Sequence, residues 1–457
     1  MIHEISRPSD GLEMTKNMKI IADLHVHSRF SRACSKDLTL ENNASWCEKK
    51  GVNVLGTGDF THPLWFKEIE EKLVEAEPGL YKLKSVLENL PAGRQVRFMM
   101  TTEVSQIYKR GGKVRRVHNL IFAPSIECVK KINAWLDEHK FNRKSDGRPI
   151  LGIDSEVLYR ELKNLDDRIV LAPAHAWTPW FAVFGSKSGF DSLQDCFGEM
   201  TKEVFAIETG LSSDPAMNRA LSVLDRLSLI SNSDAHSPQN FGREANVFEI
   251  EDSRLSFDEL MRVLRERDLV HFLYTIEFFP EEGKYHVDGH APCGLRFSVA
   301  ETKRLKGLCP KCGKLITVGV LSRVEDLADR SFAEAGSMMM PGEKGEASLA
   351  RTAEFVPFKS IVPLPQVLAE CLNVSSVSSK KVMVLYEEMI AKLGNEFFIL
   401  LDAPVVEIRS AFGETVAEAI SRVRAGKVSI NPGYDGIFGT VRIFSDKEKE
   451  NFQRKLF

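Results

Sequence analysis

Residues 19–27 read KIIADLHVH, an apolar run that ends in the pair His25 and His27. A short apolar run is typical of a buried strand, and the two-residue spacing puts both imidazoles on the same side of it. Two imidazoles on one side can reach the same ion, and nitrogen ligands suit Zn, Mn or Fe. The stretch therefore predicts a strand that carries part of a metal site at its end.

The same arrangement recurs along the first half of the chain. Strands are predicted at 52–57, 97–102, 169–172 and 227–231, and a carboxylate or a histidine follows each of them. The candidate metal ligands are His25, His27, Asp59, His62, Glu103, His118, His175, Asp234 and His236. Glu103 can bridge two ions, and we expect Asp234, Glu103 and His118 to take part in catalysis, because paired ions activate water and stabilise phosphoryl displacement.

The order of these elements predicts the fold class. Ligands at the carboxyl ends of successive strands match the active-site face of a (β/α) barrel. We expect an α/β chain with a polar extension at 1–18, a metal-hydrolase barrel at 19–275, a zinc-binding module at 276–325 and a mainly helical C-terminal domain at 326–457. Gly111-Gly112 predicts a hairpin turn within the barrel. The Gly- and Met-rich residues 330–350 predict a linker or loop.

A second metal site is predicted beyond the barrel. His290 and Cys293 form one HxxC pair, and Cys309 and Cys312 form a CxxC pair fifteen residues further on. Four such ligands suit a closed tetrahedral zinc site, which is structural because no position stays open. His286 is the alternative to His290 as the fourth ligand.

Composition limits the possible partners. The chain has 457 residues, 27% of them charged, and a net charge of −3, so any nucleic acid must bind to local basic patches. Lys113, Arg115 and Arg116 form such a patch beside the predicted hairpin turn. No apolar run approaches the roughly 20 residues that a membrane helix needs, and the N-terminus lacks an apolar signal segment. We expect a cytoplasmic monomer without membrane association.

The metal motifs resemble those of the polymerase-and-histidinol-phosphatase (PHP) family over residues 19–250. The resemblance implies a distorted seven-stranded (β/α) barrel that holds two or three divalent ions (Zn, Mn or Mg) for phosphoester hydrolysis. Phe60 stands where the family usually has a histidine, so Asp59 or His62 must substitute. Ala33 and Cys34 stand where a further ligand is usual, so Cys34, Asp37 or no residue completes the third site.

The chain as a whole resembles the endonuclease Q family of PHP-domain DNA repair nucleases. The resemblance is carried by ADLHVHSRFS (22–31), GTGDFTHPLWF (56–66), LAPAHAWTPWFAVFGSKSGFDS (171–192), NSDAHSP (232–238), YHVDGHAPCGLRFS (285–298), CPKCGK (309–314) and NPGYDGIFG (431–439). It implies a metal-dependent endodeoxyribonuclease that incises DNA 5′ of uracil, hypoxanthine, xanthine and abasic sites. The lesion would have to leave the stack. The aromatic residues Trp177, Trp180, Phe181 and Phe184 after His175 are candidates for stacking on bases or for loop packing.

Two other functions compete with this interpretation. A small-molecule phosphoesterase of the PHP family would explain the barrel but leave the zinc module without a role. A DNA-binding module with an inactive barrel is opposed by the nearly complete ligand set. At the chain end, Gln453, Leu456 and Phe457 match the first half of a motif that binds sliding clamps, although an exposed charged chain end is the favoured explanation of these residues.

Overall fold

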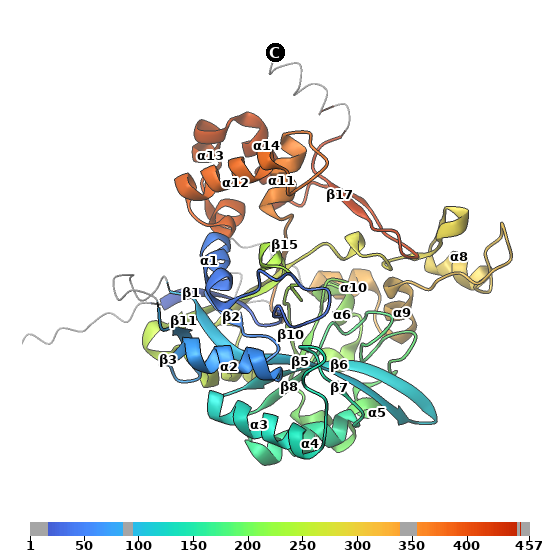
Figure 1. Ribbon diagram of the computed structural model, residues 1–457. Coiled ribbons are helices and arrows are strands. Elements are labelled where there is room, and N and C mark those ends of the chain that lie inside the picture. The colour runs from blue at the N-terminus through green and yellow to red at the C-terminus, as the bar shows by residue number, and fades with distance from the viewer. Residues whose placement is uncertain (1–16, 86–94, 339–353, 446–447, 449–457) are drawn as a thin grey trace, which may run out of the picture.

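A large mixed sheet forms the centre of the computed structural model, which describes residues 17–85, 95–338, 354–445 and 448. Figure 1 shows a body around this sheet, a cluster of helices above it and a small arm beside it. Most of the predicted N-terminal extension and the predicted clamp motif lie outside the described residues. Among the described residues, no helix is long and apolar enough to span a bilayer.

The sequence 19–27 lies at the middle of the sheet. Strand β1 (Asn17–Asp23) pairs in parallel with β2 (Val54–Gly56) and antiparallel with β11 (Ala245–Glu251). The sheet continues from β2 into β5 (Arg97–Arg110), then β6 (Lys113–Ala123) and β8 (Val170–Pro173). β9 (Ala206–Glu208) and β10 (Ser228–Ile230) form a separate parallel pair. The predicted strands are therefore present with ends within two residues of those expected, except that β5 runs on to Arg110, eight residues beyond its predicted end at 102.

The expected (β/α)7 barrel is not confirmed, because the sheet is mixed. β5 and β6 form a long antiparallel hairpin, and β6 pairs antiparallel with β8. The predicted turn at Gly111 and Gly112 is confirmed, and both residues have the positive φ (59° and 73°) that glycine adopts without steric cost. A tight hairpin can only join antiparallel strands, so this insertion breaks the parallel order that a regular barrel requires.

The remaining elements cover the sheet and build the two extensions. The strands are β3 (Leu73–Glu77), β4 (Leu80–Leu83), β7 (Ile150–Leu151), β12 (Phe272–Glu277), β13 (Asp288–His290), β14 (Leu295–Phe297), β15 (Phe358–Ser360), β16 (Ser429–Asn431) and β17 (Thr440–Arg442). The helices of the body are α1 (Leu40–Lys50), α2 (Pro63–Lys72), α3 (Ile126–Glu138), α4 (Ser155–Leu165), α5 (Leu193–Phe197), α6 (Pro215–Arg219) and α7 (Phe257–Glu266). Beyond them lie α8 (Val299–Arg304), α9 (Val320–Leu327), α10 (Phe332–Met338), α11 (Leu364–Cys371), α12 (Lys380–Leu393), α13 (Val405–Phe412) and α14 (Glu414–Arg424).

Two features of the second half differ from the sequence prediction. Part of the predicted linker forms helix α10, in which Ala335 is fully buried. The last hairpin, β16–β17, returns to the arm, where Gly289 lies so close to Tyr434 that any side chain at 289 would collide with its ring. Asp435 accepts a hydrogen bond from the Ala291 amide at 2.6 Å. Both features depend on contacts with distant parts of the chain, so the local sequence does not predict them.

A buried ion pair attaches the C-terminal helices to the body. Lys50 of α1 lies 2.8 Å from Glu396, and both side chains are 4% exposed. Glu396 also accepts hydrogen bonds from the Tyr386 hydroxyl (3.0 Å) and the Leu364 amide (3.0 Å). The Glu396 carboxylate therefore depends on Lys50, because a buried carboxylate without a cationic partner lowers the stability of the fold.

Replacing Lys50 by methionine is expected to lower the free energy of unfolding by about 3–5 kcal/mol, since the Glu396 charge loses its partner. The neighbouring pair of Lys49 and Glu387 is much more accessible, with side chains 32% and 47% exposed, so Lys49→Met is a matched control with an expected loss of about 0–1 kcal/mol. Denaturant unfolding of the two variants measures the difference. Equal stability of the two would contradict a role for Lys50 in holding the helices.

Candidate metal centre

The predicted ligands from five separate parts of the chain meet at one edge of the sheet. His25 and His27 lie just beyond β1, Glu103 lies within β5 and Asp234 follows β10, and one atom from each of these four falls within 4.8 Å of the others. A second group, whose ligand atoms also lie within 4.8 Å of one another, contains Glu103, His118 of β6 and His175 after β8. The two groups share Glu103, so the structure brings six of the predicted ligands into one centre.

Glu103 faces both groups, and each of its two carboxylate oxygens lies toward one of them. Its Oε1 lies 2.5 Å from Nδ1 of His118 and 3.0 Å from Nε2 of His175. Its Oε2 lies 3.5 Å from Nε2 of His27 and 3.7 Å from Nε2 of His25. A carboxylate placed in this way has the arrangement needed to bridge two neighbouring cations.

Carboxylates on the outer side orient the two imidazoles of the HxH pair. Nδ1 of His25 lies 3.0 Å from Glu208, and Nδ1 of His27 lies 3.1 Å from Asp59. A hydrogen bond at Nδ1 leaves Nε2 free for a metal, a pattern common in metalloproteins. Nε2 of His25 is buried and makes no hydrogen bond to the described residues. This orphaned nitrogen and the mixed donor set fit a divalent metal.

The electrostatics of the centre without metal also fit cation binding. Burial lowers the pKa of His27, but the carboxylates of Asp59 and Asp234 outweigh it and raise the pKa to about 9. Burial raises the pKa of Asp234, but the imidazoles of His25 and His27 hold it well below its usual range. A binding cation must displace the imidazolium protons, so metal loading should weaken as the pH falls.

The structure places three other predicted ligands outside both groups. Asp59 uses Oδ1 for His27, while Oδ2 accepts hydrogen bonds from the Ser28 amide (2.6 Å) and the Ser31 hydroxyl (2.8 Å). His62 stacks on Phe30 with ring centroids 4.4 Å apart. His236 packs against the His27 ring at 4.7 Å. Metal binding by these three stays a prediction, and Asp59 orients His27 in the structure.

The backbone around the centre is strained at several of these positions. Asp59, His175 and Asp234 have φ values of 47°, 29° and 46°, which residues other than glycine rarely adopt. Such conformations cost of order 1–3 kcal/mol each and persist where the surrounding structure holds them, often at functional sites. At Gly210 a side chain would collide with His175, so glycine is needed beside this ligand.

Two residues of the centre were missed from the sequence. Glu208 ends β9, as the other predicted ligands end their strands, so the same rule could have found it. No sequence pattern indicated that Arg148 belongs to the site, because it lies in the irregular segment between α3 and β7. Its Nη1 lies 3.2 Å from Oε2 of Glu103, and its side chain is 21% exposed. Arg148 therefore brings a cation to the edge of the site.

The residues considered for a third ion lie apart from both groups. Burial, with a contribution from Asp59, raises the pKa of the Cys34 thiol to about 12, so it is protonated at neutral pH. Asp37 is exposed and bonds to the Ser35 hydroxyl at 3.2 Å. The third ion stays a prediction.

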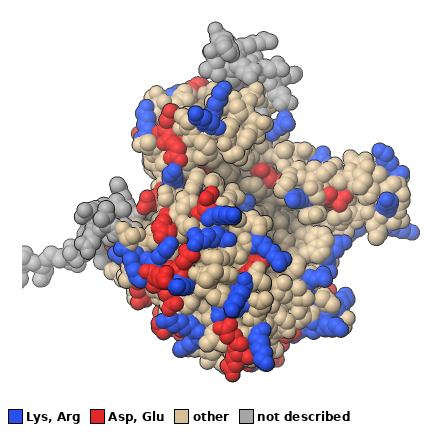
Figure 2. All heavy atoms as spheres, in the orientation of Figure 1, with Lys and Arg blue, Asp and Glu red and all other residues tan. Residues whose placement is uncertain are grey.

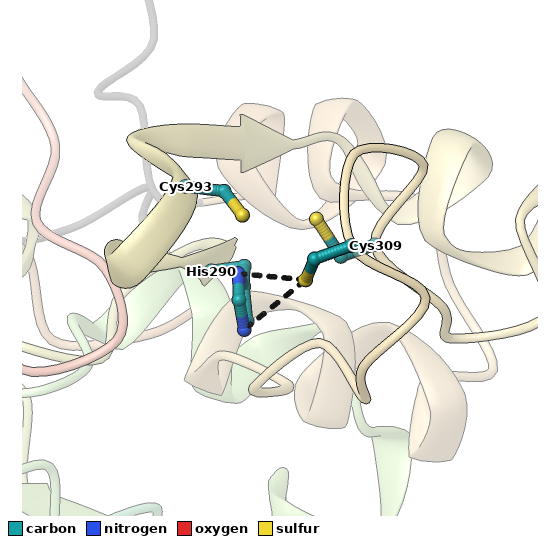
Figure 3. Close-up of side chains that lie close together, drawn as sticks. His290, Cys293 and Cys309 are labelled. Atoms are coloured by element: carbon teal, nitrogen blue, oxygen red, sulfur yellow. Dashed lines mark hydrogen bonds between the residues drawn. The ribbon is translucent and has the colours of Figure 1, made fainter.

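The predicted zinc ligands also meet. His290, Cys293, Cys309 and Cys312 offer ligand atoms that all lie within 4.8 Å of one another. Figure 3 shows the side chains of His290, Cys293 and Cys309 pointing toward one another. His286, the alternative ligand, is not in this group, and burial lowers its pKa to about 4. The donor set matches a structural zinc site.

The turn between Cys309 and Cys312 favours the thiolate form of Cys309. Burial raises the pKa of Cys309, but hydrogen bonds from the backbone amides of Lys311 and Cys312 bring it below its ordinary value. Gly313, with a φ of 70°, lets the chain reverse, and its amide bonds to the Cys309 carbonyl at 2.8 Å. Thiolate is the form that binds zinc.

The aromatic residues after His175 separate into two kinds. Trp177 and Phe184 are buried and pack together with ring centroids 4.8 Å apart, so they belong to the core. Trp180 is 41% exposed, and its ring meets Tyr285 edge-on at 5.8 Å. The Phe181 ring lies 4.7 Å from that of His118. Loop packing thus accounts for two of the four, and Trp180 stays accessible near the metal centre.

Comparison with known proteins adds independent information. A family model described as the MJ0043 C-terminal domain matches residues 363–427, which include α11 to α14. An uncharacterized protein of Methanocaldococcus jannaschii, MJ0043, is 33% identical over 58% of this chain, but the chain spans only 31% of its length. The lesion-specific endonuclease PfuEndoQ from Pyrococcus furiosus is 30% identical in its crystal structure, with a TM-score of 0.77 over 95% of this chain and 99% of that one.

A second solved structure has a similar relation to this chain. It is an endonuclease Q in complex with a 27-mer duplex that has an abasic lesion at the active site. It is 31% identical, with a TM-score of 0.76 over 94% of this chain and 98% of that one. The fold, the donor set and these similarities define a metal-dependent hydrolase of the nuclease and phosphoesterase class. The chain belongs to the endonuclease Q family.

Proposed function

We propose that this protein is a metal-dependent DNA endonuclease that incises the phosphodiester 5′ of deaminated bases (uracil, hypoxanthine and xanthine) and of abasic sites during DNA repair. The observation that carries the proposal is the Glu103-bridged donor set. A related endonuclease Q holds an abasic lesion at its active site, which supports a damaged duplex as the substrate here.

The residues of the centre have distinct roles in this proposal. His25, His27, Glu103, His118, His175 and Asp234 would hold two divalent ions (Zn, Mn or Mg). Asp59, His62 and His236 stay predicted ligands, and a third ion stays a prediction. Bound ions would supply Lewis-acid stabilisation of the charge that develops on the phosphodiester. Arg148 faces the same position and adds a fixed cation for the phosphate. The strands that end at this centre would belong to a distorted (β/α)7 barrel of the PHP type.

The β5–β6 hairpin supplies a surface for the DNA backbone. Lys113, Arg115 and Arg116 lie next to its turn, and Lys113 is exposed. Figure 2 shows basic side chains gathered on the side of the body where this hairpin projects. Because phosphate contacts carry affinity without sequence information, the surface would bind damaged and undamaged duplex alike.

Trp180 supports the step in which the lesion leaves the stack. Thr178, two residues before it, contacts Nδ1 of His175 at 3.1 Å, and the Phe181 carbonyl accepts a hydrogen bond from the His118 amide at 3.0 Å. The loop that carries Trp180 is therefore attached to two metal ligands. An exposed indole at this place can stack on a base next to the scissile phosphate, where base stacking contributes about 1–3 kcal/mol.

A nicking assay tests the function. We expect cleavage of a duplex with a single uracil, hypoxanthine or abasic site when Mg²⁺ or Mn²⁺ is present, and no cleavage of the undamaged duplex or after chelation. Phosphate release from small esters without nicking would support a small-molecule phosphoesterase instead. DNA binding without either activity would support a binding module. Clamp binding through Gln453 and Leu456 stays a prediction, as does the monomeric state.

A further inference from the structure

A polar cavity of about 490 Å³ lies between the hairpin turn and the loop that follows the metal centre. One wall is formed by Lys113 and Arg115 of β6, and another by residues 185–189, which read GSKSG. Arg323 of α9 closes a third side. Four cations and one carboxylate, Asp191, therefore line this space. Neither the metal centre nor the zinc site uses it.

The two arginines hold the walls in place. The Arg115 guanidinium donates to the Gly189 carbonyl and lies 4.2 Å from the centre of the Phe190 ring. Arg323 donates to the carbonyls of Phe184 (2.9 Å) and Phe190 (3.0 Å). The GSKSG loop is thus fastened from both sides, by the hairpin and by α9. A loop fastened in this way offers a preformed site, which lowers the entropy cost of binding.

The two lysines remain available for a ligand. Lys113 and Lys187 are exposed, and within the described parts of the chain neither amine forms an ion pair. The only carboxylate of the cavity is neutralised, because Asp191 pairs with Arg323 at 2.6 Å. Ser186 of the lining is exposed, while the Ser188 hydroxyl is buried and donates to the Arg116 carbonyl at 3.3 Å. The cavity therefore presents positive charge and the exposed Ser186 hydroxyl to an anion, and suits a phosphate.

We propose that this cavity binds a single backbone phosphate of the DNA, through Lys113 and Lys187, a short distance from the cut. The proposal rests on the proposed function and names the place where the strand is held. Lys113 and Arg115 precede the metal-ligand His118 on the same strand by five and three residues, or about 10–17 Å at roughly 3.3 Å per residue. DNA rises 3.4 Å per nucleotide, so the bound phosphate lies about three to five nucleotides from the scissile bond.

The test combines a protein change with a change in the DNA. Lys113→Gln/Lys187→Gln removes both amines, and Lys67→Gln/Lys130→Gln removes two exposed lysines of α2 and α3 as the control with the same loss of charge. Duplexes with one abasic site carry a neutral methylphosphonate at one position, moved along each strand in turn. Dissociation constants, nicking rates and salt dependence are measured for the wild-type protein and both variants, with circular dichroism to verify folding.

We expect the wild-type protein to lose affinity, by roughly ten-fold or more, when one particular phosphate three to five nucleotides from the cut is neutralised. The cavity variant should bind weakly to every duplex, show no further loss at that position, and have a salt dependence reduced by about one unit, since one phosphate contact is missing. The control variant should keep the wild-type pattern.

The outcomes separate this proposal from the function. A cavity variant that keeps the wild-type salt dependence, or the same sensitive position, would overturn the phosphate site while nicking by the wild-type protein still supported the endonuclease. A wild-type protein that neither binds nor nicks damaged duplex would overturn the proposed function and this site with it. The single variant Lys187→Gln repeats the comparison if the double variant is unfolded.

Discussion

Asp234→Asn is expected to reduce the nicking rate by roughly 10³-fold or more, because replacing the carboxylate by a neutral amide should empty or distort a metal site on which the reaction depends. Asp234 Oδ1 lies 2.9 Å from Nε2 of His27 and 3.6 Å from Nε2 of His25, inside the four-ligand group. An amide keeps the shape but not the charge. Asparagine also tolerates the left-handed backbone that Asp234 adopts, so the fold should persist.

Three measurements together distinguish this role from a general loss of structure. Nicking should fall, the metal content of the purified variant should drop, and the dissociation constant for duplex DNA should stay near the wild-type value because the basic hairpin is intact. Asp258→Asn, at an exposed carboxylate on α7, is the matched control and should leave all three unchanged. Full nicking by Asp234→Asn with unchanged metal content would refute the assignment.

Cys309→Ser is expected to unfold the arm, because a structural zinc ion contributes about 10–16 kcal/mol in small zinc modules. The apolar core of this arm is small: the buried cluster consists of Phe297, Cys309 and Ile316. So few apolar groups cannot order a polar segment without a further link. The variant should contain one zinc ion fewer, and proteases should cut within residues 290–317 that resist them in the wild-type protein.

The matched control for loss of a thiol is Cys371→Ser in the C-terminal helices, which should change neither zinc content nor the digestion pattern. Elemental analysis and limited proteolysis provide the two measurements. Because the β16–β17 hairpin packs on the arm, its residues should become sensitive to protease together with the arm. An unchanged zinc content in Cys309→Ser would show that the four residues do not form the site.

The positions of the six candidate metal ligands that meet in the structure were predictable from the sequence. Each ligand directly follows a short apolar strand or lies within one, and strand periodicity is a local property that nearby residues determine. The pair His25 and His27, the hairpin turn at Gly111-Gly112 and the HxxC and CxxC pairs are features of this kind. The chain order of motifs also indicated the family. Local spacing therefore indicated the six residues that meet, but it did not separate them from Asp59, His62 and His236, which lie outside both groups.

The tertiary structure alone decided the roles that depend on distant partners. Trp177 and Trp180 lie three residues apart, yet one is buried and the other 41% exposed. Glu208 and Asp59 orient imidazoles that lie far from them in sequence, and Arg148 reaches Glu103 from an irregular segment. Strand direction in the sheet and the return of β16–β17 to the arm depend on burial as well. Packing between distant segments fixes these features, because burial and hydrogen-bond partners arise only when the chain is folded.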